Sequence, residues 1–385
     1  MYTQYYPLTE EQELFRRTVR EIAEKKIAPL AAEIDESDEF PWKAIEVLRE
    51  HDLLGLGCPE EYGGGGADLL TCCLAVEEIA RVSAPLAPRI SASAMIGEAI
   101  YLGGTKEQKE KYLYKLSRGE IIPAFALTEP EAGSDAFSLR TRAVRDGDGW
   151  VINGSKCFTT NADVADFTLV MARTSGEKGP LGISAFIVDK GTPGFIISRV
   201  ERKMAGHGIH TCEVALEDCR VPSNALLGEE GMAFANLEGL NKSRTLVGGV
   251  GVGLAQGALD VACRYAMERQ QFGRPIIRFQ AIQIMLADMA TKIEAARQLV
   301  YKACILSDMK HADAMMLSSM SKYYATDVAM EVTTDAVQIL GGYGYMKDYP
   351  VERMMREAKV LQIFEGTNQI QRFLVARGLQ GKYGS

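Results

Sequence analysis

The period of the apolar residues changes twice along this chain of 385 residues, and this change constrains the fold more than any other feature of the sequence. Over the first 120 residues apolar side chains recur every three or four positions, as on one face of a helix. From about residue 121 short β-rich runs follow, bounded by Gly, Pro, Asp and Asn, and no helical segment alternates with them. The helical period returns after about residue 231. The pattern predicts an α+β protein: a helical domain at residues 1–120, an all-β sheet or barrel domain at 121–230, and a helical bundle domain at 231–385. A doubly wound parallel sheet is not expected.

The least polar segment of the chain, TLVGGVGVGLAQGALDVA at residues 245–262, permits three interpretations. Its glycines do not have the G-x-G-x-x-G spacing of a dinucleotide-binding loop, and no strand precedes it. A membrane span is not favoured, because the segment also contains Gln256 and Asp260. We therefore expect a core helix whose glycines let neighbouring helices pack closely.

Charge and cysteine content narrow the class of protein. The net charge of −8 does not favour nucleic-acid binding, which usually needs a basic surface, but it is compatible with an anionic ligand. The eight cysteines form no C-x-x-C pair and have no histidine at ligand spacing, so we expect buried reduced thiols and no metal site. The first residues show neither the basic nor the apolar part of an export signal. We expect a cytoplasmic protein without a membrane span.

Three glycine-containing segments are candidate ligand-binding sites, and each has a structural alternative. LTEPEAGSD, at residues 127–135, suits a phosphate or a polar ring edge, or is a capped turn. MERQQFGRP, at residues 267–275, combines arginines with an aromatic ring, which suits a phosphate and a flat ligand, or is a charged helix end. QILGGYGY, at residues 338–345, lets a ligand approach the backbone or ends a helix in a Schellman motif. None of these segments decides the function alone.

Glu365, in LQIFEGTNQIQR at residues 361–372, is the candidate catalytic group. It follows Ile363 and Phe364, and a carboxylate partly desolvated by such neighbours would have a raised pKa and act as a base near neutral pH. Alternatively, its charge favours the N-terminus of the last helix. Its chemistry alone leaves both interpretations open.

Six stretches in order resemble the acyl-CoA dehydrogenase family, flavoproteins that desaturate CoA thioesters. They are PEEYGG, TEPEAGSD, KCFTTNA, ERQQFGRP, QILGGYGY and EGTNQIQR, and they extend the resemblance over essentially the whole chain. The resemblance implies an N-terminal helical domain, a middle β domain and a C-terminal four-helix bundle. It also implies FAD as cofactor, an acyl-CoA substrate, an electron-transferring flavoprotein as electron acceptor, and a homotetramer built as a dimer of dimers.

The resemblance further implies which residues hold FAD. The flavin ring is expected along Leu127 and Thr128 on one side and against Phe158 on the other, where many members carry Trp instead of Phe. The segment 269–272 is expected to reach the adenylate of FAD in the neighbouring subunit. The complete implied set is Phe125, Leu127, Thr128, Gly133, Ser134, Phe158, Thr159, Thr160, Arg269, Gln271, Phe272, Gln280, Gln338, Gly341, Gly342, Thr367 and Gln369.

For the reaction, the resemblance implies that Glu365 removes the α-proton while the β-hydrogen leaves as hydride to the flavin. One branch of the family carries this glutamate at the position of Ser243, which cannot act as the base. Asn241 replaces an aspartate of many members, which puts one charged contact to the substrate in doubt. The residues implied to contact the acyl-CoA are Ser91, Ser134, Asn241, Ser243, Arg244 and Gly366.

We therefore expect FAD-dependent α,β-dehydrogenation of a short, branched or alicyclic acyl-CoA. The small residues of the segment 86–100 leave room for such acyl groups, although they can equally serve to pack helix against helix. Two other functions are compatible with the motifs: an acyl-CoA oxidase, whose chains are typically much longer, and a flavin- and CoA-binding partner subunit without catalysis. Enoyl-CoA reduction, the reverse reaction, fits the same residues.

Overall fold

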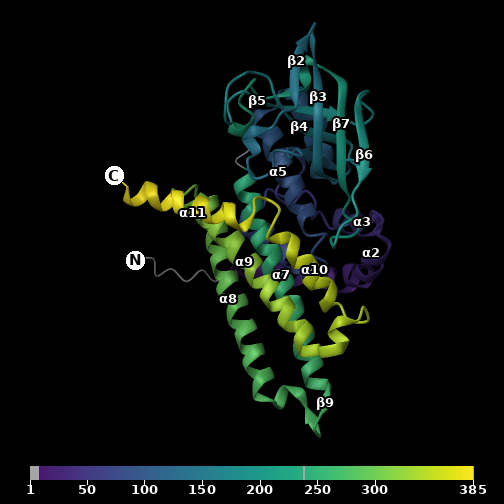
Figure 1. Ribbon diagram of the computed structural model, residues 1–385, viewed down its shortest axis with the longest axis vertical. Helices are drawn as coiled ribbons and strands as arrows, with labels where there is room; N and C mark the ends of the chain where they lie inside the picture. The colour runs from purple at the N-terminus through teal and green to yellow at the C-terminus, as the bar shows by residue number, and fades with distance from the viewer. Residues whose placement is uncertain (1–7, 237–238, 385) are drawn as a thin grey trace.

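The computed structural model describes residues 8–236 and 239–384. Along the chain, a helical part is followed by a sheet and then by a second helical part, in the order that the periodicity predicts. The sheet forms one end of the elongated molecule and the long C-terminal helices extend to the other end (Figure 1). The predicted fold class is thus confirmed. The N-terminal helices are α1 (Glu10–Ile22), α2 (Ala31–Ser37), α3 (Trp42–Glu50), α4 (Leu69–Ala80), α5 (Pro88–Gly103) and α6 (Lys106–Ser117).

Local sequence signals set the ends of the N-terminal helices. A capping box begins the first helix: the backbone N–H of Gln12 donates to the Thr9 hydroxyl at 3.1 Å, and the Gln12 side chain accepts from the Thr9 N–H. The glycine-rich loop before α4 interrupts the helices, and a Cβ on its Gly64 would lie 2.2 Å from the carbonyl oxygen of Cys58. Only glycine permits this close approach of two backbone segments.

The middle part is one sheet of eight strands in the order β6-β7-β3-β2-β4-β5-β8, with β1 paired to β4. Neighbouring strands are antiparallel except for the parallel pairs β1–β4 and β2–β4, as expected for a sheet without crossover helices. The strands are β1 (Pro123–Ala126), β2 (Arg142–Asp146), β3 (Gly149–Thr160), β4 (Phe167–Arg173), β5 (Ile183–Asp189), β6 (Phe195–Val200), β7 (Thr211–Pro222) and β8 (Leu226–Leu227).

The C-terminal part is a bundle in which α7, α8, α9 and α10 pack side by side, while α11 leaves the bundle and points away from it (Figure 1). A short hairpin, β9 (Gln270–Gln271) with β10 (Arg274–Pro275), joins α7 to α8 at the end farthest from the sheet. The helices are α7 (Gly239–Glu268), α8 (Gln280–Asp308), α9 (Ala314–Leu340), α10 (Val351–Leu361) and α11 (Asn368–Tyr383).

Helix α7 contacts α4 and α9 through its glycines. A Cβ on Gly253 would lie 2.1 Å from the carbonyl oxygen of Glu77 on α4, and a Cβ on Gly251 would lie 2.9 Å from that of Ala325 on α9. The backbones of the three helices therefore touch, which confirms the close packing predicted from the sequence. Asn241–Glu268 is the one stretch of the described residues with the length and hydropathy of a membrane span, and 78% of its most apolar window is buried inside the protein.

Buried ion pairs hold the N-terminal helices on the bundle. Glu78 of α4 accepts from Arg16 of α1 at 2.8 Å, and Glu77 accepts from Arg297 of α8 at 3.0 Å and from the Tyr301 hydroxyl at 2.8 Å. Both carboxylates are almost completely buried, and such charges are tolerated when opposite charges and donors surround them. Helix α4 is thereby fixed beside α7, where it forms one wall of the cavity described below.

We predict that Gly253→Ala strongly destabilises the protein, because the added methyl group would overlap the α4 backbone and such overpacking costs about 1–3 kcal/mol or more. Thermal unfolding of the purified variant measures the effect. Gly381→Ala is the matched control: it lies in α11, and its Cβ would meet no atom within 4 Å. An equal change in the Tm of both variants would contradict the role given to the α7 glycines.

Candidate active site

Glu365 lies in a strained turn between α10 and α11. Its φ is +55°, in the left-handed region that side chains other than glycine rarely adopt, and Gly366 follows at +89°. A non-glycine residue in this conformation costs about 1–3 kcal/mol and persists only where its surroundings hold it. The turn separates the Glu365 carboxyl from both helices, so the charge does not simply continue the N-terminus of α11, whose cap is the hydroxyl of Thr367.

Side chains from three helices hold this turn by its carbonyl oxygens. The Glu365 carbonyl accepts from Arg244 Nε of α7 at 3.3 Å and from Gln371 Nε2 of α11 at 3.1 Å. The Gly366 carbonyl accepts from Lys322 Nζ of α9 at 2.8 Å and also from Gln371 Nε2 at 3.2 Å. The conformation of Glu365 is therefore imposed by the bundle rather than by the turn itself.

Burial and two cations act in opposite directions on the Glu365 carboxyl. Burial raises its pKa, whereas the Arg244 guanidinium, a hydrogen bond from the Ser243 hydroxyl and the Lys322 ammonium lower it. Burial also lowers the pKa of Lys322, to about 8, and that of Arg244. The Glu365 carboxyl is thus half-buried beside compensating positive charge, an arrangement that would suit a base working near neutral pH.

A cavity of about 280 Å³ is lined by α4, α5, the start of α7, the end of α8 and the loop before α4. Ser243 belongs both to the cavity wall and to the hydrogen bond with Glu365. Small side chains form much of the remaining wall. They are Gly57, Cys58, Ala67, Cys72, Ser91, Ala94 and Gly239.

Two features of the wall bear on the sequence predictions. Ser91 and Ala94 face the cavity, whereas Ser93 is buried beside it, with its carbonyl accepting from the Cys58 thiol. Burial raises the pKa of Cys58 to about 11 and that of Cys72 to about 12, so both remain uncharged thiols. The eight cysteines are free, and all but Cys263 are buried. Helix α5 therefore contributes small side chains to the cavity wall and also packs on its neighbours.

Asn241 and Arg244, both expected to contact the substrate, bind each other. Arg244 Nη1 donates to the Asn241 amide oxygen at 2.8 Å, and the Ser318 hydroxyl donates to the Asn241 carbonyl at 2.6 Å. The amide thus accepts the hydrogen bond that a carboxylate would accept at this position, without its negative charge. Arg244 remains oriented toward Glu365.

On the sheet, a buried ion pair fixes the first of the segments that are expected to contact the flavin. Lys156 Nζ donates to the Leu127 carbonyl at 3.1 Å and to Glu129 Oε1 at 2.7 Å. Glu129 also accepts from the backbone N–H of Thr141 at 2.9 Å, and the Cys157 N–H donates to the Thr128 carbonyl at 2.9 Å. The segment around Thr128 is therefore held against β3 from both sides.

The next residues of β3 form a bulge that exposes an aromatic ring. The pairing of β3 with β7 shifts between Lys156 and Thr159, and Phe158 within it has φ +56° and a side chain that is 65% exposed. An aromatic side chain directed outward beside the 127–129 segment provides a flat surface for a ring. The structure thus brings together the two segments expected on either side of the flavin.

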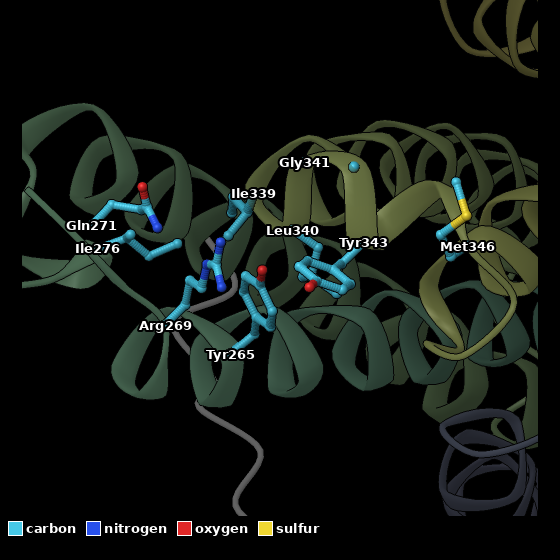
Figure 2. A pocket seen from close by; sticks show the side chains of 10 residues that line it. Tyr265, Arg269, Gln271, Ile276, Ile339, Leu340, Gly341, Tyr343 and Met346 are labelled. Carbon is cyan, nitrogen blue, oxygen red and sulfur yellow. The ribbon is translucent and has the colours of Figure 1, made fainter.

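The second set of predicted cofactor residues lines a pocket of about 580 Å³ at the far end of the bundle (Figure 2). Arg269 and Gln271 come from the end of α7 and the hairpin, and Gly341 and Gly342 from the turn after α9. Gly341 has φ +62° and ψ −135°, which is not the αL conformation of a Schellman motif. A Cβ on either glycine would meet no atom within 4 Å, so both present open backbone to the pocket.

The two sets lie at opposite ends of the molecule, because the β9–β10 hairpin lies at the end of the bundle remote from the sheet (Figure 1). Phe272, at the tip of this hairpin, is 92% exposed and has φ +51°. One chain therefore does not assemble all the predicted cofactor residues into one site. Among the other predicted positions, Gly133, Ser134, Thr160, Gln280, Gln338 and Gln369 are exposed, Phe125 and Thr367 are half-buried, and Thr159 is buried.

The sequence analysis did not single out four residues that the structure places at these sites. Lys322 and Gln371 hold the Glu365 turn, and Lys156 holds the 127–129 segment. Tyr343 lies under the Arg269 guanidinium, whose Cζ is 5.4 Å from the ring centre. The two lysines carried no sequence signal of burial, because a lysine that follows a serine is commonly interpreted as a surface charge.

Three family models match consecutive parts of the chain. They are the acyl-CoA dehydrogenase N-terminal domain at residues 9–120, the middle domain at residues 124–219 and the C-terminal domain at residues 229–380. The chain is also similar to a curated protein, cyclohex-1-ene-1-carbonyl-CoA dehydrogenase of Syntrophus aciditrophicus. The two are 48% identical over 374 residues, which cover 97% of this chain and 90% of that protein.

Solved structures agree with these matches. Butyryl-CoA dehydrogenase from Megasphaera elsdenii superimposes with a TM-score of 0.94 at 41% identity, covering 98% of this chain and all of that one. A chain in a structure titled electron transferring flavoprotein of Acidaminococcus fermentans also has a TM-score of 0.94, at 48% identity, with 98% of this chain and 99% of that one covered.

We predict that Lys156→Met destabilises the protein by about 3–5 kcal/mol, because it leaves Glu129 as a buried charge without its partner. Adding Glu129→Gln should restore part of the loss, since the amide oxygen still accepts from the Thr141 N–H. Thermal unfolding of the two single variants and the double variant checks this. Strictly additive losses would show that the two side chains do not stabilise each other.

Proposed function

This chain belongs to the acyl-CoA dehydrogenase family and is therefore an oxidoreductase, and from this premise we propose that it dehydrogenates a short, branched or alicyclic acyl-CoA between C2 and C3, with Glu365 as the base. The supporting observation is the position of Ser243, which lines the 280 Å³ cavity and whose hydroxyl is near enough to the Glu365 carboxyl to lower its pKa. A thioester placed beside Glu365 would therefore have its acyl group in a cavity of fitting size.

In the proposed reaction, Glu365 takes the proton from C2 while the hydrogen on C3 leaves with its electron pair. FAD, when bound, supplies the hydride acceptor. The products are the 2-enoyl-CoA, reduced FAD and a protonated Glu365. Holding the thioester between the carboxylate and the cofactor removes orientational entropy from the barrier.

The negative charge that develops on the thioester oxygen requires a hydrogen-bond donor in place before the reaction. Within the described residues, the backbone N–H of Glu365 donates to no protein acceptor. The strained turn thereby leaves this N–H available next to the carboxyl group of the same residue. We propose that it donates to the thioester oxygen.

The residues present fit FAD at two places on the chain. The 127–129 segment and Phe158 offer a flat surface and polar backbone for the flavin, and the open glycines with Arg269 suit the adenosine diphosphate part. Because these places lie at opposite ends of one chain, we propose that each FAD is bound by two copies. The exposed Phe272 supports such an interface, and a homotetramer built as a dimer of dimers satisfies it.

Two further parts of the proposal concern the substrate and the acceptor. A wall of small side chains suits a branched or ring-shaped acyl group, and the similar protein from Syntrophus aciditrophicus is named for an alicyclic substrate. We propose an electron-transferring flavoprotein as the acceptor of the electrons. The likeness to the Acidaminococcus fermentans chain supports this choice.

Glu365→Gln should retain FAD and bind acyl-CoA but reduce the flavin on the order of 100- to 10,000-fold more slowly, because the base is absent. Anaerobic mixing with butyryl- and cyclohexanecarboxyl-CoA, followed by the loss of visible flavin absorbance, measures this rate. A shift of the oxidised flavin spectrum on ligand addition serves as the binding control. Wild-type rates in the variant would remove Glu365 from the role.

Ala94→Leu should narrow the cavity and lower kcat/KM for cyclohexanecarboxyl-CoA relative to butyryl-CoA by about 10-fold or more, since added side-chain volume excludes the wider acyl group first. Ala92→Leu, on the same helix but outside the cavity wall, is the matched control. If both variants left the ratio unchanged, this cavity would not be the acyl site.

A further inference from the structure

Lys322 lies in the middle of the bundle beside the proposed base. It comes from α9 and its side chain is completely buried. Its Nζ donates to the Gly366 carbonyl at 2.8 Å and to the Asn368 amide oxygen at 3.0 Å. Both acceptors belong to the segment that carries Glu365, so this lysine joins α9 directly to the strained turn.

No carboxylate oxygen of the described residues lies within 4.0 Å of the Lys322 ammonium. Both of its hydrogen-bond acceptors are uncharged, although burying an ammonium group in protein usually requires a paired anion. Asp327, the nearby acid on the same helix, is engaged elsewhere: it accepts from Arg372 Nη2 at 2.7 Å and from Asn368 Nδ2 at 2.8 Å. Glu365 and Asp327 therefore both act on the Lys322 ammonium through space, without a direct ion pair.

The charged groups facing Glu365 come from α7 and α9. They are Arg244 and Lys322, with the uncharged hydroxyl of Ser243 between the carboxyl and the cavity. Two cations thus surround one carboxylate. Burial lowers the pKa of Lys322 more than the Glu365 and Asp327 carboxylates raise it, and the resulting pKa is about 8.

We propose that Lys322 is a positioning residue for proton abstraction, which holds the strained turn by the Gly366 carbonyl and favours the ionised form of Glu365 through its charge. This inference rests on the proposed function of Glu365. The same charge also stabilises the negative charge that develops as the α-proton leaves, because positive charge in a water-poor site acts strongly.

The two roles of Lys322 differ in what a substitution changes. Loss of the hydrogen bond alone would loosen the turn and slow the reaction equally at every pH. Loss of the charge would raise the pKa of Glu365, so that more of the base is protonated at neutral pH and the ionised form returns only at higher pH. The pH profile therefore separates a positioning and electrostatic role from a merely structural one.

The experiment measures the rate of anaerobic flavin reduction by saturating butyryl-CoA between pH 5.5 and 9.5. The FAD-loaded wild type is compared with Lys322→Met, Lys322→Gln and Lys322→Arg. Lys322→Gln keeps a hydrogen-bond donor without the charge, and visible absorbance reports the FAD content of each variant. Lys292→Met, a surface lysine on α8 that pairs with Glu331, is the control for the same change in total charge.

We expect the midpoint of the acid limb to move up by about one pH unit in Lys322→Met and Lys322→Gln, which corresponds to a rate about 10-fold lower below the midpoint. At high pH the rate of Lys322→Gln should approach that of Lys322→Arg. Lys322→Met, which also loses the hydrogen bond to the Gly366 carbonyl, should keep an additional loss that does not depend on pH. Lys292→Met should keep the wild-type midpoint. A uniform loss at every pH, or a profile that superimposes on the wild type, would overturn the proposal. A wild-type protein that no acyl-CoA reduces would instead overturn the proposed function itself.

Discussion

The close contact of α7 with α4 and α9 is the constraint on which the site depends. Because glycines let these backbones touch, the start of α7 forms part of the cavity wall and also packs on α9, the helix that carries Lys322. Ser243 and Arg244 are thereby brought to the Glu365 turn. A wider spacing of the helices would separate the cavity, the base and the two cations from one another.

The packing of these helices fixes the conformation of the turn that carries Glu365. A left-handed residue is held by carbonyl contacts from three helices, so its carboxyl and its own N–H are both available for a ligand. Burial raises the pKa of the Glu365 carboxyl, and the nearby positive charges lower it. The local strain is compensated by the folded bundle, as expected for residues at functional sites.

The period of apolar residues was sufficient to predict the order of helices and sheet, and glycines in an apolar segment were sufficient to predict a closely packed core helix. Glu365 was identified through its motif, but its backbone conformation was not, because the strain is imposed by Arg244, Lys322 and Gln371, which are distant in sequence. Lys322 was missed because the sequence alone does not distinguish a buried lysine from a solvent-exposed one. The predicted cofactor residues lie in two sets, one on the sheet and one at the far end of the bundle (Figure 1). Only the family resemblance led us to expect this separation, because spacing along the chain does not show which end of a bundle a residue occupies.

The central claim is that Glu365 removes the α-proton, and the exchange of that proton tests it without any redox step. The ligand is an acyl-CoA in which sulfur replaces C3, so that no β-hydrogen can leave and only the α-proton can be lost. The FAD-loaded protein is incubated with this ligand in D2O, and mass spectrometry measures deuterium at C2. The account predicts rapid incorporation with the wild type and almost none with Glu365→Gln; equal incorporation by the two proteins would contradict it.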